Sequence, residues 1–390
     1  MRILYLGDDT RHGSALDRAR ALSRLGHAVR VVNPHRALPV SRWLNALHFR
    51  TGYRLCCRRV RRSVLAEVSS EQFDVVWVDG GFAVSRRLLG DLSRQAAWLM
   101  NYNLDDPFGS RDGRCWDTFR RSIPAYDLLC VVRVENLDEA RALGARRVTR
   151  VWRGYDPVSH RPRKLDAADL KRWASDILFV GTWMPERGRF LAELIRRGVP
   201  LVIYGNRWEK AREWPTLRRA WRGPGVVGAD YVKAIQCAKV SLGLLSRGNR
   251  DQHTQRSAEI PFIGGLFCAE RTDEHRQMFT EGREAVFWAD AAECAGRCAW
   301  LLNHEVEREQ IATAGGARVR ALKLSNDEVM AKILNTLFDH PVAEGPPHIG
   351  DRQAAASGLA LHFVSPHPGP LPSGEGELRD SSVMGQRSAR

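Results

Sequence analysis

The polar residues of segment 249–261 have types and spacing that suit the binding of a phosphorylated sugar ligand. The segment reads Asn-Arg-Asp-Gln-His-Thr-Gln-Arg-Ser-Ala-Glu-Ile-Pro. We expect Thr254 to cap a helix that carries Arg256 and Glu259 on one face, three residues apart. Free N–H groups at the helix start and the Arg256 cation would bind a diphosphate, and Glu259 would accept two hydrogen bonds from a ribose diol. The pattern indicates nucleotide-sugar binding; the alternative is a surface Arg256–Glu259 ion pair.

A second candidate group consists of two adjacent carboxylates, Asp105 and Asp106, which follow the apolar run 97–101. Ligands of open parallel sheets bind at the carboxyl ends of the strands, so these side chains are expected to project into the site. There one of them would act as a base on an acceptor hydroxyl if the reaction inverts the transferred sugar. The alternative is a pair of turn acids before Pro107. Their spacing is not Asp-x-Asp, and we expect no metal site.

The elements that must position these groups alternate between short apolar runs and amphipathic stretches. Residues 2–6 predict a strand, Ser14 is expected to cap the helix that follows, and Gly26 ends it. Further strands of the first half are predicted at residues 28–32, 73–78, 97–100 and 128–132. Buried strands that alternate with helices predict an α/β fold with a doubly wound parallel sheet.

The same alternation starts again after the Gly- and Pro-containing segment 152–157. Strands are predicted at 177–180, 200–204, 240–245 and 266–269, with Gly264 and Gly265 ending the helix before the last of them. The predicted domains are therefore residues 1–155 and 156–340, two Rossmann-like units that face a central cleft. Apolar residues at 329, 333, 334 and 337 predict a final helix that packs against a domain.

Residues 341–390 differ in composition, with seven Pro and seven Gly, and are expected to be disordered and dispensable. The chain has no apolar run of the roughly 18 to 20 residues that a spanning helix needs and no signal-peptide pattern, so we expect a cytoplasmic protein. Its 8 Cys show no zinc-site spacing and are expected to be structural thiols.

The formal net charge of +15 is concentrated in the first half, where residues 1–155 contain 27 Arg and 16 acids. A basic helix face that passes Leu55 and Val60 is expected from Arg50, Arg54, Arg58, Arg59, Arg61 and Arg62, and the surface prediction concerns Arg50, Arg54, Arg58 and Arg61. We predict that this face attracts an anionic acceptor or the inner face of an anionic membrane, at which the protein would be peripheral. The alternative is an ordinary solvated surface.

Residues 253–288 resemble the signature of the CgeB-type glycosyltransferases, named after a spore maturation protein. The motif begins His-Thr-Gln-Arg-Ser-Ala-Glu-Ile-Pro-Phe-Ile-Gly-Gly-Leu-Phe-Cys-Ala-Glu-Arg-Thr-Asp-Glu-His. The resemblance continues in Tyr-Asn-Leu-Asp-Asp-Pro-Phe at 102–108 and Trp-Arg-Gly-Tyr-Asp-Pro at 152–157, so it covers most of residues 1–335. It implies the GT-B architecture of two Rossmann-like domains, which agrees with the organisation derived above.

The wider GT-B pattern implies roles for further residues. It has two acids separated by seven positions. Asp251 stands at the first, where a catalytic role is implied, and Glu259 stands at the ribose-binding second. Its diphosphate loop resembles residues 181–188, in which Gly181 and Arg187 match and Thr182 replaces the usual Arg. Arg256 or Arg250 would then supply the missing cation.

The remaining expected contacts complete a donor site and an acceptor site. His253, Thr254, Gly264 and Gly265 are assigned to the donor. Gly7, Asp8 and Asn103 are assigned to the acceptor.

The sequence therefore predicts a glycosyltransferase that moves a sugar from a nucleotide-diphosphate donor, bound by residues 156–340, to an unidentified acceptor: a glycan, a lipid-linked molecule or a protein. Cations and helix N-termini would stabilise the leaving diphosphate, and no cofactor or metal is expected. One alternative is a sugar-nucleotide epimerase of the same architecture. The other is a basic nucleic-acid-binding protein, although we find no motif that reads RNA or DNA, and we expect no nucleic-acid partner.

Overall fold

The computed structural model describes residues 1–39 and 41–339. The tail predicted at residues 341–390 lies outside them. Within the described part, no helix is both long and apolar enough to cross a membrane.

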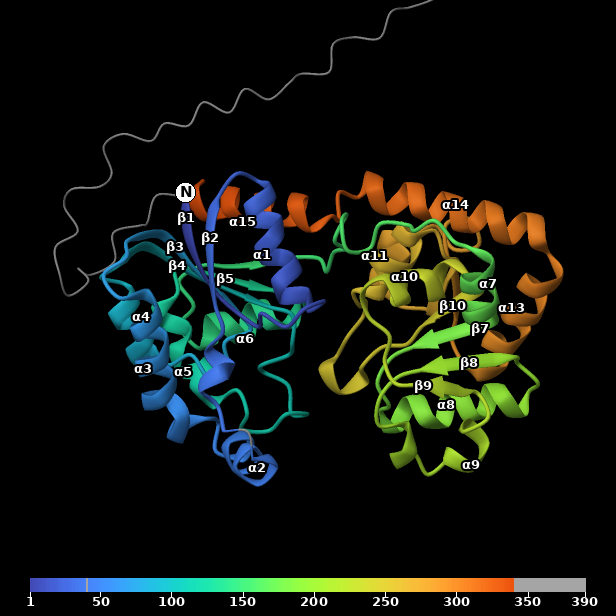
Figure 1. Cartoon of the computed structure of the whole chain (residues 1–390), viewed down its shortest axis with the longest axis horizontal. Coiled ribbons are helices and arrows are strands. Elements are labelled where there is room, and N and C mark those ends of the chain that lie inside the picture. Colours follow the sequence, from blue (N-terminus) through green and yellow to red (C-terminus); the bar gives the residue numbers. More distant parts are fainter. Residues whose placement is uncertain (40, 340–390) are drawn as a thin grey trace, which may run out of the picture. The chain divides into compact units, whose positions relative to one another are not determined.

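The first half of the chain forms a sheet of six parallel strands, in the order β2-β1-β3-β4-β5-β6 (Figure 1). The strands are β1 (Arg2–Leu6), β2 (Ala28–Val32), β3 (Phe73–Asp79), β4 (Ala96–Asn103), β5 (Leu128–Val131) and β6 (Val148–Arg150). The central strands consist almost wholly of buried apolar residues, because helices cover both faces of a parallel sheet. All five strands predicted in this half are confirmed.

Helices connect these strands, as expected for crossover connections between parallel strands. They are α1 (Ser14–Arg24), η1 (Pro34–Ala37), α2 (Arg42–Arg50), η2 (Arg54–Cys56), α3 (Cys57–Val68), α4 (Arg86–Leu92), α5 (Asp117–Ser122), η3 (Ile123–Ala125) and α6 (Glu135–Ala142). The predicted Ser14 cap is wrong: Ser14 is the first helical residue, and Gly13 precedes it as the N-cap.

The single helical face predicted from Arg50 to Arg61 is also wrong. The helix is interrupted between α2 and η2, where Gly52 and Tyr53 both have positive φ. Of the two apolar residues on the predicted face, Leu55 is exposed and Val60 is buried.

The second half forms another sheet of six parallel strands, in the order β12-β11-β10-β7-β8-β9. Its strands are β7 (Ser175–Val180), β8 (Leu201–Tyr204), β9 (Trp221–Gly223), β10 (Ala238–Gly243), β11 (Phe267–Glu270) and β12 (Val286–Trp288). The four strands predicted in this half are confirmed. Together the two sheets establish the predicted α/β fold with two doubly wound units.

Along the chain, the first helix of the second half precedes β7, the following ones connect successive strands, and the last three come after β12 (Figure 1). They are α7 (Ala167–Trp173), α8 (Pro185–Arg196), η4 (Trp208–Lys210), α9 (Trp214–Leu217), α10 (Gly228–Gln236), η5 (Arg247–Asn249), α11 (Arg256–Ile263), α12 (Asp273–Met278), α13 (Ala291–Asn303), α14 (Glu305–Ala321) and α15 (Asn326–Phe338).

The last helix, α15, packs on the first sheet although it follows the second sheet in sequence. Val329, Met330 and Ile333 belong to the same apolar cluster as Ile3 and Tyr5 of β1. Ser325 caps the helix and Glu328 completes a capping box. The predicted packing of this helix against a domain is therefore confirmed, and the domain that it covers is the N-terminal one.

The strand orders place a topological switch point in each sheet. In the second sheet the chain runs from β7 through β8 to β9 on one side and then returns to β10 on the other side of β7. In the first sheet β1 lies between β2 and β3 in the same way. Ligands of doubly wound sheets bind at the carboxyl ends of the strands at such points. The candidate site is therefore expected after β7 and β10, and after β1 and β3.

Candidate functional site

Two arginines lie at the carboxyl ends of β7 and β10, at the switch point of the second sheet. Arg256 begins α11, and its Nε donates to the carbonyl oxygen of Val180 at the end of β7, 2.8 Å away. Arg187, in the first turn of α8, donates from Nε to the carbonyl of Leu245 at 3.2 Å and from Nη2 to that of Leu244 at 3.2 Å, both just after β10. These bonds fix the direction of both guanidinium groups.

Neither Arg187 nor Arg256 has a carboxylate within ion-pair distance among the described residues. Desolvation, and then the positive charge of Arg256, lower the pKa of Arg187 to about 10. The desolvated Arg187 and the half-buried Arg256 repel each other, so the two cations form a site that an anion would stabilise. A cavity of about 290 Å³ adjoins Arg187 and is lined also by Leu244, Leu245 and Trp288.

Gly181 lies beside this group of cations. A Cβ atom there would come within 2.7 Å of the Phe179 ring and 3.5 Å of Arg187 Nη1, so the position requires glycine. The carbonyl of Thr182 accepts a hydrogen bond from Arg187 Nη1 at 3.0 Å. The second cation at this place is therefore Arg256 rather than a residue of the loop 181–188.

Glu259 lies one turn after Arg256 and is buried. Its Oε2 accepts a hydrogen bond from the Tyr231 hydroxyl at 2.9 Å, and its Oε1 lies 3.7 Å from His160 Nε2. The alternative of an Arg256–Glu259 surface pair does not apply, because Arg256 instead lies over the Tyr231 ring. One carboxylate oxygen of Glu259 is thus held by Tyr231, and among the described residues the other has the 3.7 Å contact with His160 as its nearest polar partner.

Other donor contacts predicted on and beside α11 take structural positions. The predicted Thr254 cap is wrong: the N-cap is Gln255, and the Thr254 N–H donates to the Ser257 hydroxyl at 3.1 Å. Gly264 has φ +102° and ends α11 as predicted, and Gly265 packs against Ile235. Both glycines lie at the far end of this eight-residue helix, about 12 Å from Arg256. They shape the turn into β11 and do not lie beside the two cations.

His253 is fully buried, which differs from the expected contact with the transferred sugar. Its Nδ1 pairs with Glu274, and its Nε2 accepts a hydrogen bond from the Arg153 N–H at 3.2 Å. Burial, and then the nearby Arg153 guanidinium, hold the pKa of His253 well below its ordinary value. A neutral ring with both nitrogens occupied holds the chain in place and is not presented to a ligand.

The predicted catalytic acids Asp251 and Asp106 are both engaged in ion pairs. Asp251 Oδ1 accepts hydrogen bonds from Arg133 and from Arg153, the latter at 2.9 Å. Asp106 accepts two hydrogen bonds from Arg250, at 2.6 and 2.8 Å. Burial alone would raise the pKa of Asp106, but these bonds and that from Asn136 lower it overall. Both carboxylates therefore hold loops together in this structure.

Asp105 is in a different environment from its neighbour Asp106. Its side chain reaches solvent and makes no ion pair within the described part of the chain. The surrounding protein nevertheless desolvates the carboxyl group, which raises its pKa despite the opposing charges of Arg153 and Arg111. The predicted acceptor residue Asn103 fixes this turn, because its Oδ1 accepts from the Asp105 N–H at 3.0 Å. Asp105 is thus the acid of the pair that has no ion-pair partner in the described part of the chain.

The predicted acceptor residues Gly7 and Asp8 follow β1, at the switch point of the first sheet. Gly7 is buried, and a Cβ there would meet the Tyr5 ring at 2.6 Å. Asp8 accepts from the Thr10 N–H at 3.0 Å and the Thr10 hydroxyl at 2.6 Å. Burial opposes ionisation of Asp8, but these two bonds lower its pKa overall. The carboxylate stays charged and half-buried at the carboxyl end of β1.

Sequence reasoning missed the two arginines that connect the loops around the site. Arg133 follows β5 and donates to the carbonyls of Asn249 and Leu104. Arg153 follows β6 and donates to Leu104 at 2.7 Å and to the His253 carbonyl. Arg153 belongs to the motif at 152–157, whereas no local pattern singles out Arg133.

Three buried thiols form the cluster of potential metal ligands found in the described residues. The sulfur atoms of Cys268, Cys294 and Cys298 lie within 4.8 Å of one another. All three belong to the apolar core that includes Leu242 and Leu301. The fold thus brings together thiols that the spacing in sequence kept apart, and their surroundings are those of structural cysteines.

Comparison with known proteins agrees with this architecture. Residues 187–335 match the model of a family described as glycosyl transferase-like. No curated protein matches the sequence closely enough to be counted as a relative. Among solved structures, the sucrose-phosphate synthase of Thermosynechococcus elongatus is similar over 87% of this chain and 98% of its own, with a TM-score of 0.65 and 12% identity.

Two further solved structures share the fold. HepE of Anabaena, solved in complex with UDP-glucose, matches over 87% of this chain and 100% of its own, with a TM-score of 0.60 and 12% identity. A Listeria monocytogenes protein named for UDP-N-acetylglucosamine 2-epimerase matches over 88% and 98%, with a TM-score of 0.54 and 11% identity. At these identities the likeness establishes the GT-B type of fold, which glycosyltransferases and epimerases share.

Proposed function

We propose that this protein is a glycosyltransferase that takes a sugar from a nucleoside-diphosphate donor. The observation that carries the proposal is the pair Arg187 and Arg256 at the switch point of the second sheet, two oriented cations, of which Arg187 is desolvated, and neither has a carboxylate partner among the described residues. A diphosphate supplies the charge that this place lacks. The match of residues 187–335 to the glycosyl transferase-like family supports the same reading.

The roles of the other residues follow from their positions. Glu259, held by Tyr231, would accept hydrogen bonds from the ribose hydroxyls through its remaining oxygen. The two arginines would stabilise the negative charge that develops on the departing diphosphate. We expect this to proceed without a metal ion, because the protein's own cations neutralise the diphosphate.

On the acceptor side, Asp105 is the proposed proton acceptor. Desolvation raises the pKa of Asp105, and a carboxylate with a raised pKa is a stronger base than an ordinary aspartate. Asp8 and Gly7, at the switch point of the first sheet, are proposed to contact the acceptor. Asp106 and Asp251 are proposed to position the loops around the site through their ion pairs.

The proposal is tested first by a panel of nucleotides and nucleotide sugars in thermal unfolding. A ligand at 100 times its dissociation constant adds about 2.7 kcal/mol to the free energy of unfolding. UDP-glucose is the first donor to try, because HepE is solved with it. Nucleoside diphosphates should stabilise the protein more than the matching nucleosides. Stabilisation by none of the diphosphates would contradict the donor site.

The epimerase remains the second candidate because a protein named for that activity shares the fold. Proton NMR of the stabilising nucleotide sugar, incubated with the protein but without an acceptor, separates the two. A transferase leaves the sugar unchanged or slowly releases it to water. An epimerase changes the configuration at C2 while the nucleotide stays attached, and that result would replace the transferase proposal.

A further inference from the structure

Helix α2 presents an unusual number of large apolar side chains to solvent. Trp43 is 88% exposed, Leu44 and Leu47 are each 48% exposed, and Phe49 is 39% exposed. Leu55, in η2, follows at 67%. Thirteen large hydrophobic residues are exposed in the described part of the chain, and these five lie within thirteen consecutive residues, so they form a patch.

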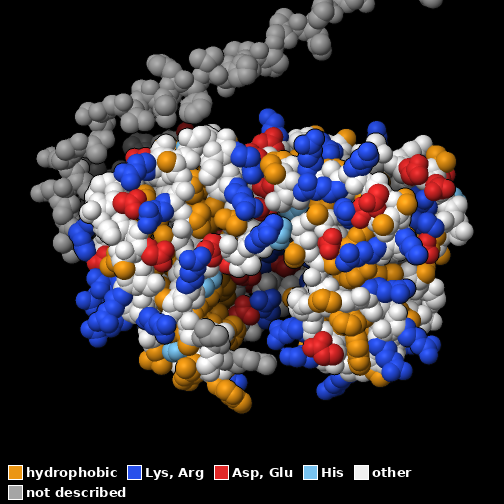
Figure 2. Space-filling model, in the orientation of Figure 1, with side chains coloured by type: hydrophobic (Ala, Val, Ile, Leu, Met, Phe, Trp, Pro, Cys, Tyr) orange, Lys and Arg blue, Asp and Glu red, His pale blue; other side chains and the backbone are white. Residues whose placement is uncertain are grey.

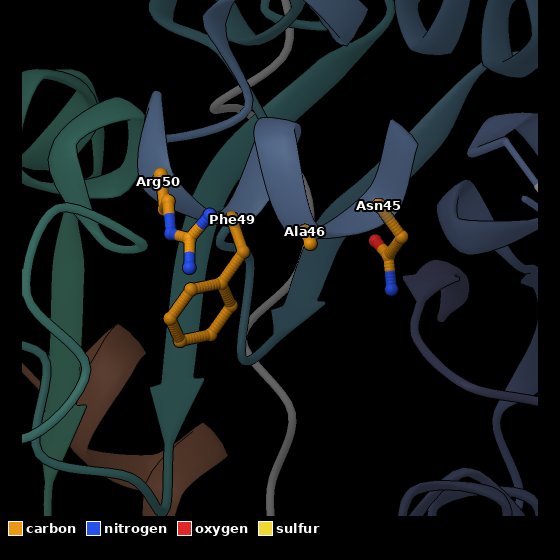
Figure 3. Close-up of a pocket in the computed structure, with 4 residues that line it drawn as sticks. All are labelled: Asn45, Ala46, Phe49 and Arg50. Carbon is orange, nitrogen blue, oxygen red and sulfur yellow. The ribbon is translucent and has the colours of Figure 1, made fainter. Parts of the chain in front are cut away.

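Three of the exposed apolar residues of α2, Trp43, Leu44 and Leu47, share one side of the helix, whereas Phe49 lies on another side. At about 100° per residue, Trp43, Leu47 and Arg50 fall within roughly 60° of one another, and Leu44 lies beside them. Asn45, Ala46, Phe49 and Arg50 line a hollow of about 460 Å³ (Figure 3). An exposed Trp and two Leu next to an Arg form an amphipathic surface of the kind that lies in a membrane interface.

The chain around this helix is strongly basic. No Asp or Glu occurs between Asp17 and Glu67, and residues 41–62 contain seven Arg. Figure 2 shows the apolar side chains gathered over α2 and the basic side chains over the neighbouring α3. The apolar patch is thus bordered by positive charge.

The structure corrects which arginines of this region carry free charge. Arg54 pairs with Asp117 at 2.9 Å, and Arg61 pairs with Asp91. Among the described residues no ion pair involves Arg50, Arg58, Arg59 or Arg62, all of which are exposed. Of the six arginines expected on the basic face, the uncompensated surface charge therefore comes from the four that are not Arg54 or Arg61.

We propose that α2 and the start of α3 form a docking surface for an anionic lipid bilayer, with Trp43, Leu44 and Leu47 in the interface and Arg50, Arg58, Arg59 and Arg62 on the lipid headgroups. A second copy of the chain fits less well, because a symmetric contact through this patch would bring its two sets of arginines together. A bilayer with negative headgroups satisfies both features at once. The proposal concerns attachment and not the reaction, so its failure leaves the proposed function standing.

The test is co-sedimentation of the full chain with vesicles of phosphatidylcholine alone or with 30% phosphatidylglycerol, over a salt series. We expect binding to the anionic vesicles only, weakening as salt rises. Arg58→Glu combined with Arg62→Glu should lower binding at least tenfold, since each lost Arg weakens it about fivefold. The matched control is Arg276→Glu with Arg283→Glu, two exposed arginines of the second half without ion pairs in the described chain. An equal loss in the control would overturn the docking site.

The apolar part is tested by Trp43→Ser with Leu47→Ser, against Leu170→Ser with Val227→Ser, which are exposed by 51% and 58% elsewhere. Only Trp43→Ser with Leu47→Ser should abolish binding to the anionic vesicles. Trp43→Phe should keep binding but lose the quenching of tryptophan fluorescence by brominated lipid. No binding at low salt, equal binding to both vesicle types, or quenching unchanged in Trp43→Phe would each refute the proposal.

Two further outcomes identify another occupant. If Trp43→Ser with Leu47→Ser alters the sedimentation coefficient of the lipid-free protein, the patch is covered by a second copy. If DNA or RNA is retained through Arg58 and Arg62 while vesicles are not, the basic border binds nucleic acid. Either result overturns the lipid surface.

Discussion

The Arg250 guanidinium forms a two-point ion pair with the Asp106 carboxylate, with Nε 2.6 Å from Oδ2 and Nη2 2.8 Å from Oδ1. The pair connects the loop after β4 with the loop after β10. It occupies Asp106, whereas the adjacent Asp105 makes no ion pair among the described residues. Two neighbouring acids with the same chemistry thus differ in their environment, because one is paired with an arginine and the other is desolvated without such a partner.

Arg250→Ala is expected to lower the free energy of unfolding by about 1–3 kcal/mol at pH 7. Buried Asp106 loses its cation but keeps the hydrogen bonds from Asn136, Phe108 and Gly109, and the half-buried Glu139 loses its ion pair with Arg250 as well. The folded-state pKa of Asp106 is lowered, so its contribution is present above the ordinary aspartate pKa and is lost as the pH falls through the lowered value.

Urea titrations of wild type and Arg250→Ala at pH 7 and below about pH 4 measure this, and the difference between the two proteins should shrink in acid. Arg141→Ala is the control, since its pair with Asp138 is largely exposed, and it should change the free energy of unfolding by less than about 0.5 kcal/mol. A pH-independent difference for Arg250→Ala would argue against the ion pair as its cause.

Asp105→Asn is expected to abolish sugar transfer while donor affinity and fold are kept. The pKa of Asp105 is raised, so the ionised carboxylate opposes folding, and this cost grows as the pH rises from the ordinary aspartate pKa through the raised one. The Asn variant should therefore be at least as stable as wild type at pH 7. Turnover assays measure the loss of sugar transfer, and thermal unfolding measures the stability. Asp138→Asn, at an exposed carboxylate, is the control for both. Full turnover by Asp105→Asn would remove the assignment.

Arg256→Ala is expected to weaken nucleoside-diphosphate binding by about 1.5–3 kcal/mol and to leave nucleoside binding unchanged, because the lost contacts are charge-assisted bonds to phosphate oxygens. Isothermal titration with both ligands measures the split. Arg320→Ala is matched to it, since Arg320 donates to the Phe262 carbonyl at the opposite end of α11. The diphosphate role fails if the nucleoside and the diphosphate lose the same affinity.

Tyr231→Phe tests whether Glu259 binds the ribose hydroxyls. The change removes the 2.9 Å hydrogen bond to Glu259 Oε2, which would leave the carboxylate less firmly positioned. We expect nucleotide binding to weaken by about 1 kcal/mol. The preference for a ribonucleotide over its 2′,3′-dideoxy analogue should also shrink, and more so in Glu259→Gln. A preference that neither variant changes would place the ribose elsewhere.

The long central strands of both sheets could be predicted because each is a run of buried apolar residues bounded by turn residues. The strands that sequence reasoning did not identify, β6, β9 and β12, have three residues each and lie at sheet edges. Three residues are too few for a periodicity to be recognised, and they become strands by pairing with a neighbour that is already formed. The N-caps predicted at Ser14 and Thr254 each differ by one residue from the N-caps in the structure, because the exact end of a helix is weakly specified by local sequence.

The sequence by itself determined the α/β alternation, the two-part organisation and the spacing that places Arg256 and Glu259 on one turn of α11. These depend on interactions within a few residues. Only the tertiary structure decided which charges remain free. Asp251 meets Arg133 and Arg153 across 118 and 98 residues, and Asp106 meets Arg250 across 144. Whether a carboxylate is a base or an ion-pair partner depends on its desolvation and its nearest cation, and folding brings both from distant parts of the chain.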